Sequence, residues 1–146
     1  MEFTSSSAHL ATKLDIEMLT RNGVSVLSSS VPHSALPRKS GLEVSRELGG
    51  RPLLRYLRIE DAKRYLRGDC NRQCVTPTPY ASPDLISFLN LPDPTTVRSH
   101  FLLLDPAKIP DVIGPRYIAW GEGIEYILTA GFSMEALVNP WPMEIR

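Results

Sequence analysis

Thirteen prolines spread over a chain of 146 residues constrain its fold more than any other feature of the sequence. Each proline lacks a backbone N–H and blocks the interior of a helix, so the pattern argues against a bundle of long helices. Prolines at this density suit short strands joined by ordered loops. We therefore expect an α+β fold, with a small split antiparallel β-sheet or barrel as its core and short helices at its periphery.

The composition is ordinary and carries no overall charge. Hydrophobic residues make up 42% of the chain and charged residues 22%, and 16 basic side chains balance 16 acidic ones. A net charge of zero provides no long-range attraction to nucleic acid or to an anionic membrane. No segment is apolar over the length of a membrane span, and the first residues lack the basic start and apolar stretch of a secretory signal. The sequence thus gives no direct sign of a nucleic-acid or membrane partner.

The two cysteines, Cys70 and Cys74, are separated by three residues. Because there is no second pair and no nearby histidine, a zinc site is not expected. The two thiols would form a disulfide in an oxidising compartment and stay reduced in a cytosol, so their spacing leaves both states open.

The first fifty residues differ in composition from the rest of the chain. Serines cluster at residues 5–7 and 28–30, and prolines and glycines interrupt the segment. Apolar residues at helical spacing predict a helix over residues 8–21, ended by Asn22 and Gly23, and a short strand is expected over residues 24–27. We interpret residues 1–50 as a leader or linker with one helix and residues 51–146 as a compact domain.

The compact domain alternates short strands and short helices. Strands are predicted over residues 53–57, from residue 73, and over 97–104, 116–120 and 124–128. Helices are predicted over residues 60–67, after Ser82 and Pro83, and as one or two turns over 133–138.

The segment from Gly121 to Leu128 places one carboxylate inside a strand that follows a glycine turn. In a strand, Ile124 and Tyr126 face one side while Glu125 faces the other. A carboxylate held in this way can be aimed into a cleft. The alternative is a half-buried edge strand whose glutamate faces water.

Two earlier elements are candidates to share a site with Glu125. The first is an arginine on the opening strand, Arg55, with Arg51 and Arg58 as rivals. The second is the segment from Val75 to Tyr80, in which two threonine hydroxyls alternate with two prolines before a tyrosine.

A family resemblance rests on these elements. Arg55-Tyr56-Leu57, Val75 to Tyr80, Gly114-Pro115-Arg116 and Gly121 to Tyr126 together resemble the C-terminal toxin domains of bacterial polymorphic toxins with an ADP-ribosyltransferase-like fold. In that superfamily an arginine, a strand with serine or threonine, and a late glutamate form the NAD-binding signature. The last segment is also similar to NAD glycohydrolases of the tuberculosis-necrotizing-toxin type, which have glutamine at the position of Glu125. Glutamate at this position favours an ADP-ribosyltransferase over an NAD glycohydrolase.

The resemblance implies a toxin or effector enzyme in which residues 51–146 form an NAD-consuming catalytic domain. The expected reaction is cleavage of NAD with transfer of ADP-ribose to a macromolecule. Three alternatives remain open: an NAD glycohydrolase that uses water as the acceptor, a non-enzymatic binding module of the same fold, and an unrelated small α+β domain with no NAD role. His100 is a candidate base for the glycohydrolase, and Glu122 is a candidate second carboxylate for the transferase.

The resemblance also assigns roles to particular residues. Glu125, Arg55 and Thr76 are the expected catalytic residues, because a carboxylate stabilises positive charge on the ribose and a guanidinium binds the diphosphate. The expected NAD-binding residues are Arg55, Thr76, Thr78, Tyr80, Gly123 and Tyr126. The chemistry needs no metal. The implied partners are NAD, an unknown macromolecular acceptor and an immunity protein. The domain would be secreted or delivered into a target cell by a specialised route and would act in the cytosol.

Overall fold

The computed structural model describes residues 3–58, 60–61, 73–80, 100–118, 123–139 and 141–145, with backbone only for residues 3–8 and 73. Two helices and seven strands are found there: α1 (Phe3–Arg21), β1 (Arg38–Lys39), α2 (Gly41–Glu47), β2 (Leu53–Leu57), β3 (Gln73–Val75), β4 (His100–Leu104), β5 (Val112–Tyr117), β6 (Ile124–Leu128) and β7 (Met143–Glu144). Three 3₁₀ turns complete the described elements: η1 (His33–Ala35), η3 (Pro106–Lys108) and η4 (Met134–Ala136). The helix predicted after Ser82, most of the one predicted over residues 60–67, and Cys70 lie outside the described residues.

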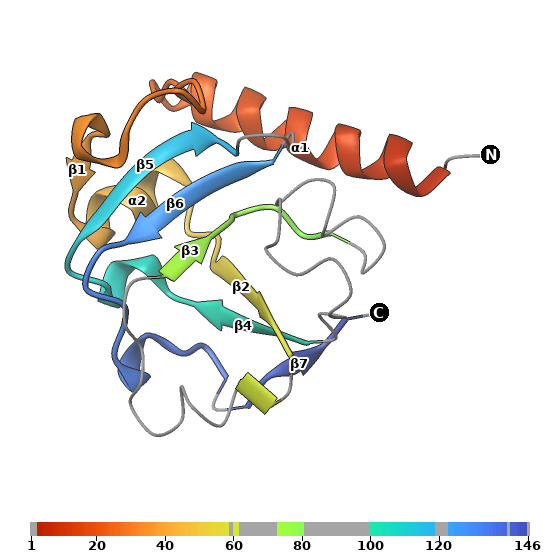
Figure 1. The fold of residues 1–146 in the computed structure, drawn as a ribbon, viewed down its shortest axis with the longest axis vertical. Helices are drawn as coiled ribbons and strands as arrows, with labels where there is room; N and C mark the ends of the chain where they lie inside the picture. The colour runs from red at the N-terminus through yellow and green to blue at the C-terminus, as the bar shows by residue number, and fades with distance from the viewer. Residues whose placement is uncertain are drawn as a thin grey trace.

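The described strands form two small antiparallel sheets (Figure 1). One has four strands in the order β1-β5-β6-β3, and the other has three in the order β2-β4-β7. The two sheets are not closed into a barrel. The α+β class and the small antiparallel sheets are therefore confirmed, and the barrel is wrong. The outer strands β1 and β7 are two residues long, which is too short for the continuous pairing that closes a sheet on itself.

The two sheets meet where β2 passes the end of β3. The backbone N–H of Leu54 donates to the carbonyl oxygen of Thr76 over 2.7 Å, and the N–H of Thr76 donates back to Leu54 over 3.1 Å. This isolated antiparallel bridge joins a strand of one sheet to the chain leaving a strand of the other. Residues around Thr76 therefore lie at the junction of the two sheets.

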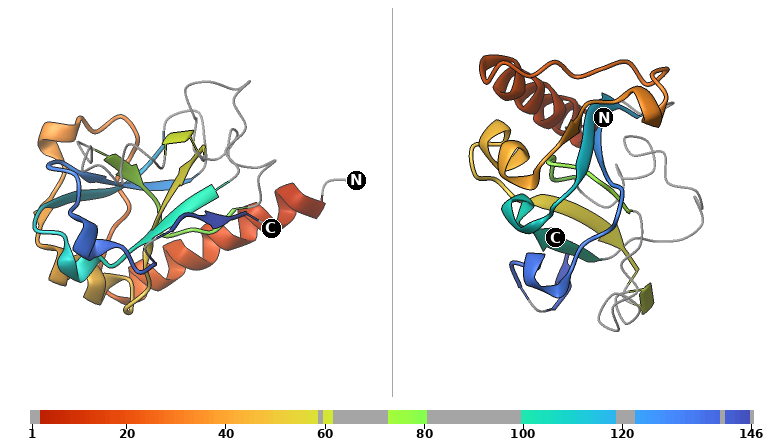
Figure 2. Two further views of the ribbon diagram at one scale, coloured as in Figure 1. Left: turned by 90° about the horizontal axis from the view of Figure 1, so that it is seen from below. Right: turned by 90° about the vertical axis from the view of Figure 1, so that its left-hand side faces the viewer.

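Helix α1 runs alongside the four-stranded sheet (Figures 1 and 2). Leu19 of α1 and Val44 of α2 are fully buried in the same core cluster as Ile124 and Tyr126 of β6. The segment before residue 50 thus contributes to the main core. The division of the chain into a leader and a catalytic domain stays a prediction.

Strand β6 lies between β5 and β3 in the interior of its sheet, and all five of its residues are buried. The predicted alternation is confirmed: Ile124, Tyr126 and Leu128 belong to the main core cluster, whereas Ile127 packs in a second cluster on the other side. The edge strand considered as an alternative for this segment is wrong, because both neighbouring positions are occupied.

Helix α2 was not predicted, although the sequence carries its signal. Ser40 caps the helix, and its hydroxyl accepts the backbone N–H of Glu43 over 3.2 Å. A serine followed three residues later by glutamate is typical of a helix start. The strand predicted over residues 24–27 is reduced to one parallel bridge, between Leu27 and Arg116.

Candidate functional site

The candidate site begins with a bulge in β5 that sets its register against β6. Ile113 pairs with Ile127 and Arg116 pairs with Glu125, so three residue steps on β5 match two on β6. Gly114, which lies inside this irregularity, has a φ angle of 121°. A side chain there would place its Cβ 3.0 Å from the carbonyl oxygen of Glu125. The bulge brings Arg116 directly opposite Glu125, on the same face of the sheet.

Glu125 forms an ion pair with Arg116. The Nε atom of Arg116 donates to Oε1 of Glu125 over 2.7 Å, and Glu125 is only 9% exposed. A buried carboxylate without a countercharge would be strongly unfavourable, and the guanidinium supplies that charge. Glu125 therefore lies in the sheet with a fixed partner on the adjacent strand.

The guanidinium of Arg116 has further partners in the segment that covers this face of the sheet. Its Nη1 donates to the carbonyl oxygens of Ser29, over 3.4 Å, and Val31. Its Nη2 lies 2.5 Å from Nε2 of His33. Since a guanidinium N–H can only donate, Nε2 of His33 is the acceptor, and the ring proton is on Nδ1.

Thr76 is brought close to Glu125 by the pairing of β3 with β6. Cys74 pairs with Ile127 and Val75 with Tyr126, so the next step along both strands carries Thr76 toward Glu125. Cys74 and Thr76 also share the face on which Glu125 lies, because side chains two residues apart on a strand point the same way.

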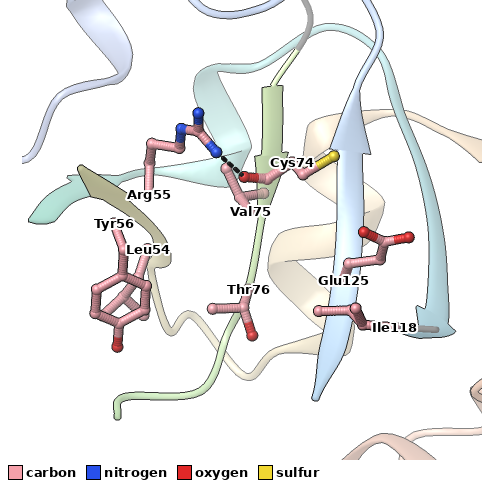
Figure 3. Close-up of a pocket in the computed structure, with 8 residues that line it drawn as sticks. All are labelled: Leu54, Arg55, Tyr56, Cys74, Val75, Thr76, Ile118 and Glu125. Carbon is pink, nitrogen blue, oxygen red and sulfur yellow. Dashed lines mark hydrogen bonds between the residues drawn. The ribbon is translucent and has the colours of Figure 1, made fainter. Parts of the chain in front are cut away.

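A pocket opens at the junction of the two sheets, with a cavity volume of about 50 Å³. Arg55, Thr76 and Glu125 all line it, and each comes from a different strand or strand end (Figure 3). The other lining residues are Leu54, Tyr56, Cys74, Val75 and Ile118. The structure therefore brings the three predicted catalytic residues to one pocket.

The three side chains differ in direction. Nη1 of Arg55 donates to the carbonyl oxygen of Cys74 over 3.1 Å, across the gap between β2 and β3. Thr76 is 2% exposed, and its hydroxyl accepts the N–H of Thr78 over 3.3 Å. Figure 3 shows β3 between Arg55 and Glu125, with the carboxylate of Glu125 turned away from Arg55. A ligand that contacts both must therefore extend across β3.

Thr78 and Tyr80, two of the predicted NAD-binding residues, contact α1. The hydroxyl of fully buried Thr78 donates to Asp15 over 2.6 Å, and the hydroxyl of Tyr80 is hydrogen-bonded to that of Thr12 over 2.5 Å. Neither residue lines the pocket. The hydroxyl of Tyr56 also holds this segment, because it donates to the carbonyl oxygen of Thr78 over 3.2 Å and accepts the N–H of Tyr80 over 2.7 Å.

Tyr126 and Gly123 also lie apart from the pocket lining. Tyr126 is fully buried, and its hydroxyl donates to Oε2 of Glu47 over 2.9 Å. Burial raises the pKa of the Tyr126 phenol well above its usual range, and the charge of Glu47 and this hydrogen bond raise it further. The carbonyl oxygen of Gly123 accepts the N–H of Ile118 over 3.0 Å, next to the start of β6.

The two rival arginines have other partners. Arg51 forms an ion pair with Asp15 and donates to the carbonyl oxygen of Pro77 over 2.8 Å. Arg58 forms an exposed ion pair with Asp61 over 3.1 Å. His100 does not line the pocket, and Glu122 lies outside the described residues.

Arg116 is the residue of this site that sequence reasoning missed as a functional group. The sequence placed it at the start of a strand after Gly114 and Pro115, whereas β5 continues through both. The available signal was an arginine and a glutamate on two successive predicted strands, where cross-strand pairs of opposite charge are favourable.

In the part of the chain that the structure describes, no cluster of three or more His, Cys, Asp or Glu side chains has metal-binding geometry. The described helices include none with the length and apolar character needed to cross a membrane. No protein-family model matches the chain, and no curated protein or solved structure matches it either. The site's geometry and chemistry are thus the basis for assigning a function.

Proposed function

We propose that this chain cleaves the bond between nicotinamide and ribose in NAD and transfers the ADP-ribose to a macromolecule. The observation that carries the proposal is the pocket lined by Arg55, Thr76 and Glu125, at the junction of two small antiparallel sheets. The split-sheet arrangement is the one expected for an ADP-ribosyltransferase-like fold, and these three residues are the ones that the family resemblance singles out.

The reaction breaks the bond between C1′ of the ribose and the pyridinium nitrogen, whose electron pair stays with the departing nicotinamide. The acceptor then forms a new bond to C1′ and loses a proton. Positive charge builds on the ribose as the first bond lengthens, as it does in glycoside hydrolysis. A carboxylate near the sugar stabilises that charge most where water is largely excluded. Glu125, at 9% exposure, meets this requirement.

The other two residues suit the remaining parts of the substrate. The planar guanidinium of Arg55 presents several donors and suits the diphosphate. The hydroxyl of Thr76 lies beside Glu125 in the register of the sheet and suits the ribose or the carboxamide of nicotinamide. No metal takes part in this scheme.

The size of the pocket indicates how NAD would enter. Its cavity volume of about 50 Å³ is well below the ~300–1,000 Å³ typical of small-molecule sites. Only a small part of the dinucleotide fits within the described walls, so the rest must lie along the surface or the walls must separate. The nicotinamide end, where the chemistry occurs, is the part assigned to the pocket.

The proposed reaction implies a biological role for the chain. The chain would be a toxin or effector domain, secreted or delivered into a target cell, that consumes NAD in the cytosol of that cell. An immunity protein that covers the pocket would be its natural inhibitor. These assignments rest on the family resemblance alone.

Nicotinamide release from NAD tests the proposal. We expect the wild-type chain to release nicotinamide, and Glu125→Gln to reduce the rate by about a hundredfold or more, because the charge facing the ribose is removed. Glu135→Gln is the matched control, since Glu135 is an exposed glutamate on η4 that does not line the pocket. Thermal unfolding of all three proteins establishes that they are equally folded.

The fate of the ADP-ribose separates the alternatives. Labelled ADP-ribose attached to protein in a target-cell lysate indicates transfer, whereas free ADP-ribose without lysate indicates a glycohydrolase. If the wild-type chain releases no nicotinamide in either case but NAD raises its melting temperature, the chain is a binding module. With neither release nor a thermal shift, the proposed function is wrong.

A further inference from the structure

We propose that Arg116 is a positioning residue for Glu125, which anchors the carboxylate to the segment 29–33 so that it meets the ribose in one orientation. This inference rests on the proposed function. It assigns to Arg116 a role that differs from that of Arg55, because Arg116 acts on the catalytic carboxylate and Arg55 on the substrate.

The contacts of Arg116 carry the inference. Its side chain is 16% exposed, and its three nitrogens all have protein acceptors: Oε1 of Glu125, two backbone carbonyls and the ring of His33. A guanidinium has five N–H donors in a rigid plane, so partners on several sides fix its orientation. The side chain is therefore committed to the protein and is poorly placed to recruit a phosphate.

The fixed guanidinium in turn determines how Glu125 presents its charge. Oε1 receives the Nε–H of Arg116 over 2.7 Å, which leaves Oε2 as the oxygen offered to a ribose hydroxyl. A glutamate side chain has three rotatable bonds, and an anchored oxygen removes much of that freedom before the substrate binds. A carboxylate anchored in this way at a nearly buried position is also well placed to stabilise an oxocarbenium ion.

The construction of β5 supports the same assignment. The bulge at Gly114 and Pro115 adds one residue to β5 relative to β6, and this residue determines which side chain faces Glu125. In a regular pairing continued from Ile113 opposite Ile127, Pro115 would face Glu125 and no cation would be available on β5. Bulges that redirect a side chain are common next to active sites.

Arg55 differs from Arg116 in its position relative to the pocket. It lines the pocket, whereas Arg116 is not among the lining residues that the structure describes. Loss of Arg55 should therefore weaken substrate binding, and loss of Arg116 should slow the chemical step with little change in binding.

Steady-state kinetics of nicotinamide release test the inference with Arg116→Gln, Arg116→Lys and a control, Arg38→Gln. We expect Arg116→Gln to lower kcat about tenfold to a hundredfold and to leave KM for NAD within about twofold, because orientation is lost and binding is not. Arg116→Lys keeps a positive charge beside Glu125 and should retain more of kcat. Arg38 lies on β1 and forms an exposed ion pair with Asp111, so its substitution should change neither constant.

Arg116 also satisfies two backbone carbonyls, so Arg116→Gln could fail to fold. His33→Ala then carries the test, since it loosens the anchor and keeps the contact between Arg116 and Glu125. A smaller fall in kcat at constant KM supports the inference, and an unchanged kcat overturns it. A rise in KM at constant kcat in Arg116→Gln overturns it as well, because Arg116 would then bind substrate. If the wild-type chain does not cleave NAD, the proposed function fails first; if it does and Arg116→Gln matches it, the inference alone fails.

Discussion

Asp15 of α1 accepts a hydrogen bond over 2.6 Å from the hydroxyl of Thr78, a residue 63 positions later in the chain. Asp15 is 3% exposed and also forms an ion pair with Arg51, whose side chain is 38% exposed. Since Thr78 lies two residues beyond Thr76, these bonds connect α1 to one wall of the pocket. Helix α1 thereby supports the geometry of the candidate site as well as the core.

Replacing Asp15 tests that support. Asp15→Ala removes the acceptor of Thr78 and the partner of Arg51, and we expect it to lower the free energy of unfolding by about 2–3 kcal/mol. The value lies below the ~3–5 kcal/mol typical of a fully buried pair because Arg51 remains partly solvated. Urea unfolding measures the change. Glu17→Ala is the control, since Glu17 is an exposed acid on the same helix, and it should stay within about 0.5 kcal/mol of wild type.

The stability of the fold should fall at alkaline pH because of Tyr56 and Tyr126. Burial raises the pKa of both phenols above the usual value of 10.0, and the neighbouring Glu47 adds to the effect at Tyr126. Below about pH 10 the phenols are protonated in the folded and unfolded chains alike, so their ionisation does not lower the free energy of unfolding. As the pH rises further the unfolded chain ionises first, so the free energy of unfolding decreases by about 1.4 kcal/mol per pH unit for each phenol.

Urea unfolding at several pH values above 9, checked against phenolate absorbance, measures this alkaline loss. We expect Tyr126→Phe to make the decline less steep, since one raised phenol is removed, although it also deprives Glu47 of a hydrogen bond. An unchanged slope in Tyr126→Phe would contradict the assignment.

Gly114 should be intolerant of a side chain. Gly114→Ala places a Cβ 3.0 Å from the carbonyl oxygen of Glu125 at a φ angle of 121°, and we expect a loss of about 1–3 kcal/mol in the free energy of unfolding. Gly23→Ala is the matched control, because Gly23 has a φ angle of 80° and open space around its Cβ position. A loss in Gly114→Ala no larger than in Gly23→Ala, measured by urea unfolding, would show that the close approach to β6 contributes nothing.

The fold could be predicted best where a local pattern agreed with its tertiary setting. The strand over residues 53–57, the strand over residues 124–128 and the helix ending at Arg21 are all observed, because apolar periodicity and a stop signal coincided. The strand predicted over residues 116–120 misses the start of β5 at Val112, because Gly114 and Pro115 interrupt the local strand pattern although they form a bulge within the strand. A bulge depends on the partner strand, which local sequence does not reveal.

The candidate site could be predicted in part for the same reason. The types and order of Arg55, Thr76 and Glu125 were enough to propose that they meet, and they line one pocket. Local sequence could not show that Thr78 would bind Asp15 or that Tyr126 would bind Glu47, since both bonds join segments more than sixty residues apart. Polar side chains that satisfy buried partners in the core resemble ligand-binding side chains when only the sequence is read.

Arg55 should contribute mainly to NAD binding if the proposed function holds. Its guanidinium offers a planar set of donors to a diphosphate, which a lysine cannot reproduce, so we expect Arg55→Lys to raise KM for NAD about tenfold with a smaller change in kcat. Calorimetric titration with NAD should show the same loss of affinity. Arg38→Lys, on an exposed arginine of β1, is the control and should bind NAD as wild type does. Unaltered affinity in Arg55→Lys would remove the diphosphate from this part of the pocket and would require another cation to hold it.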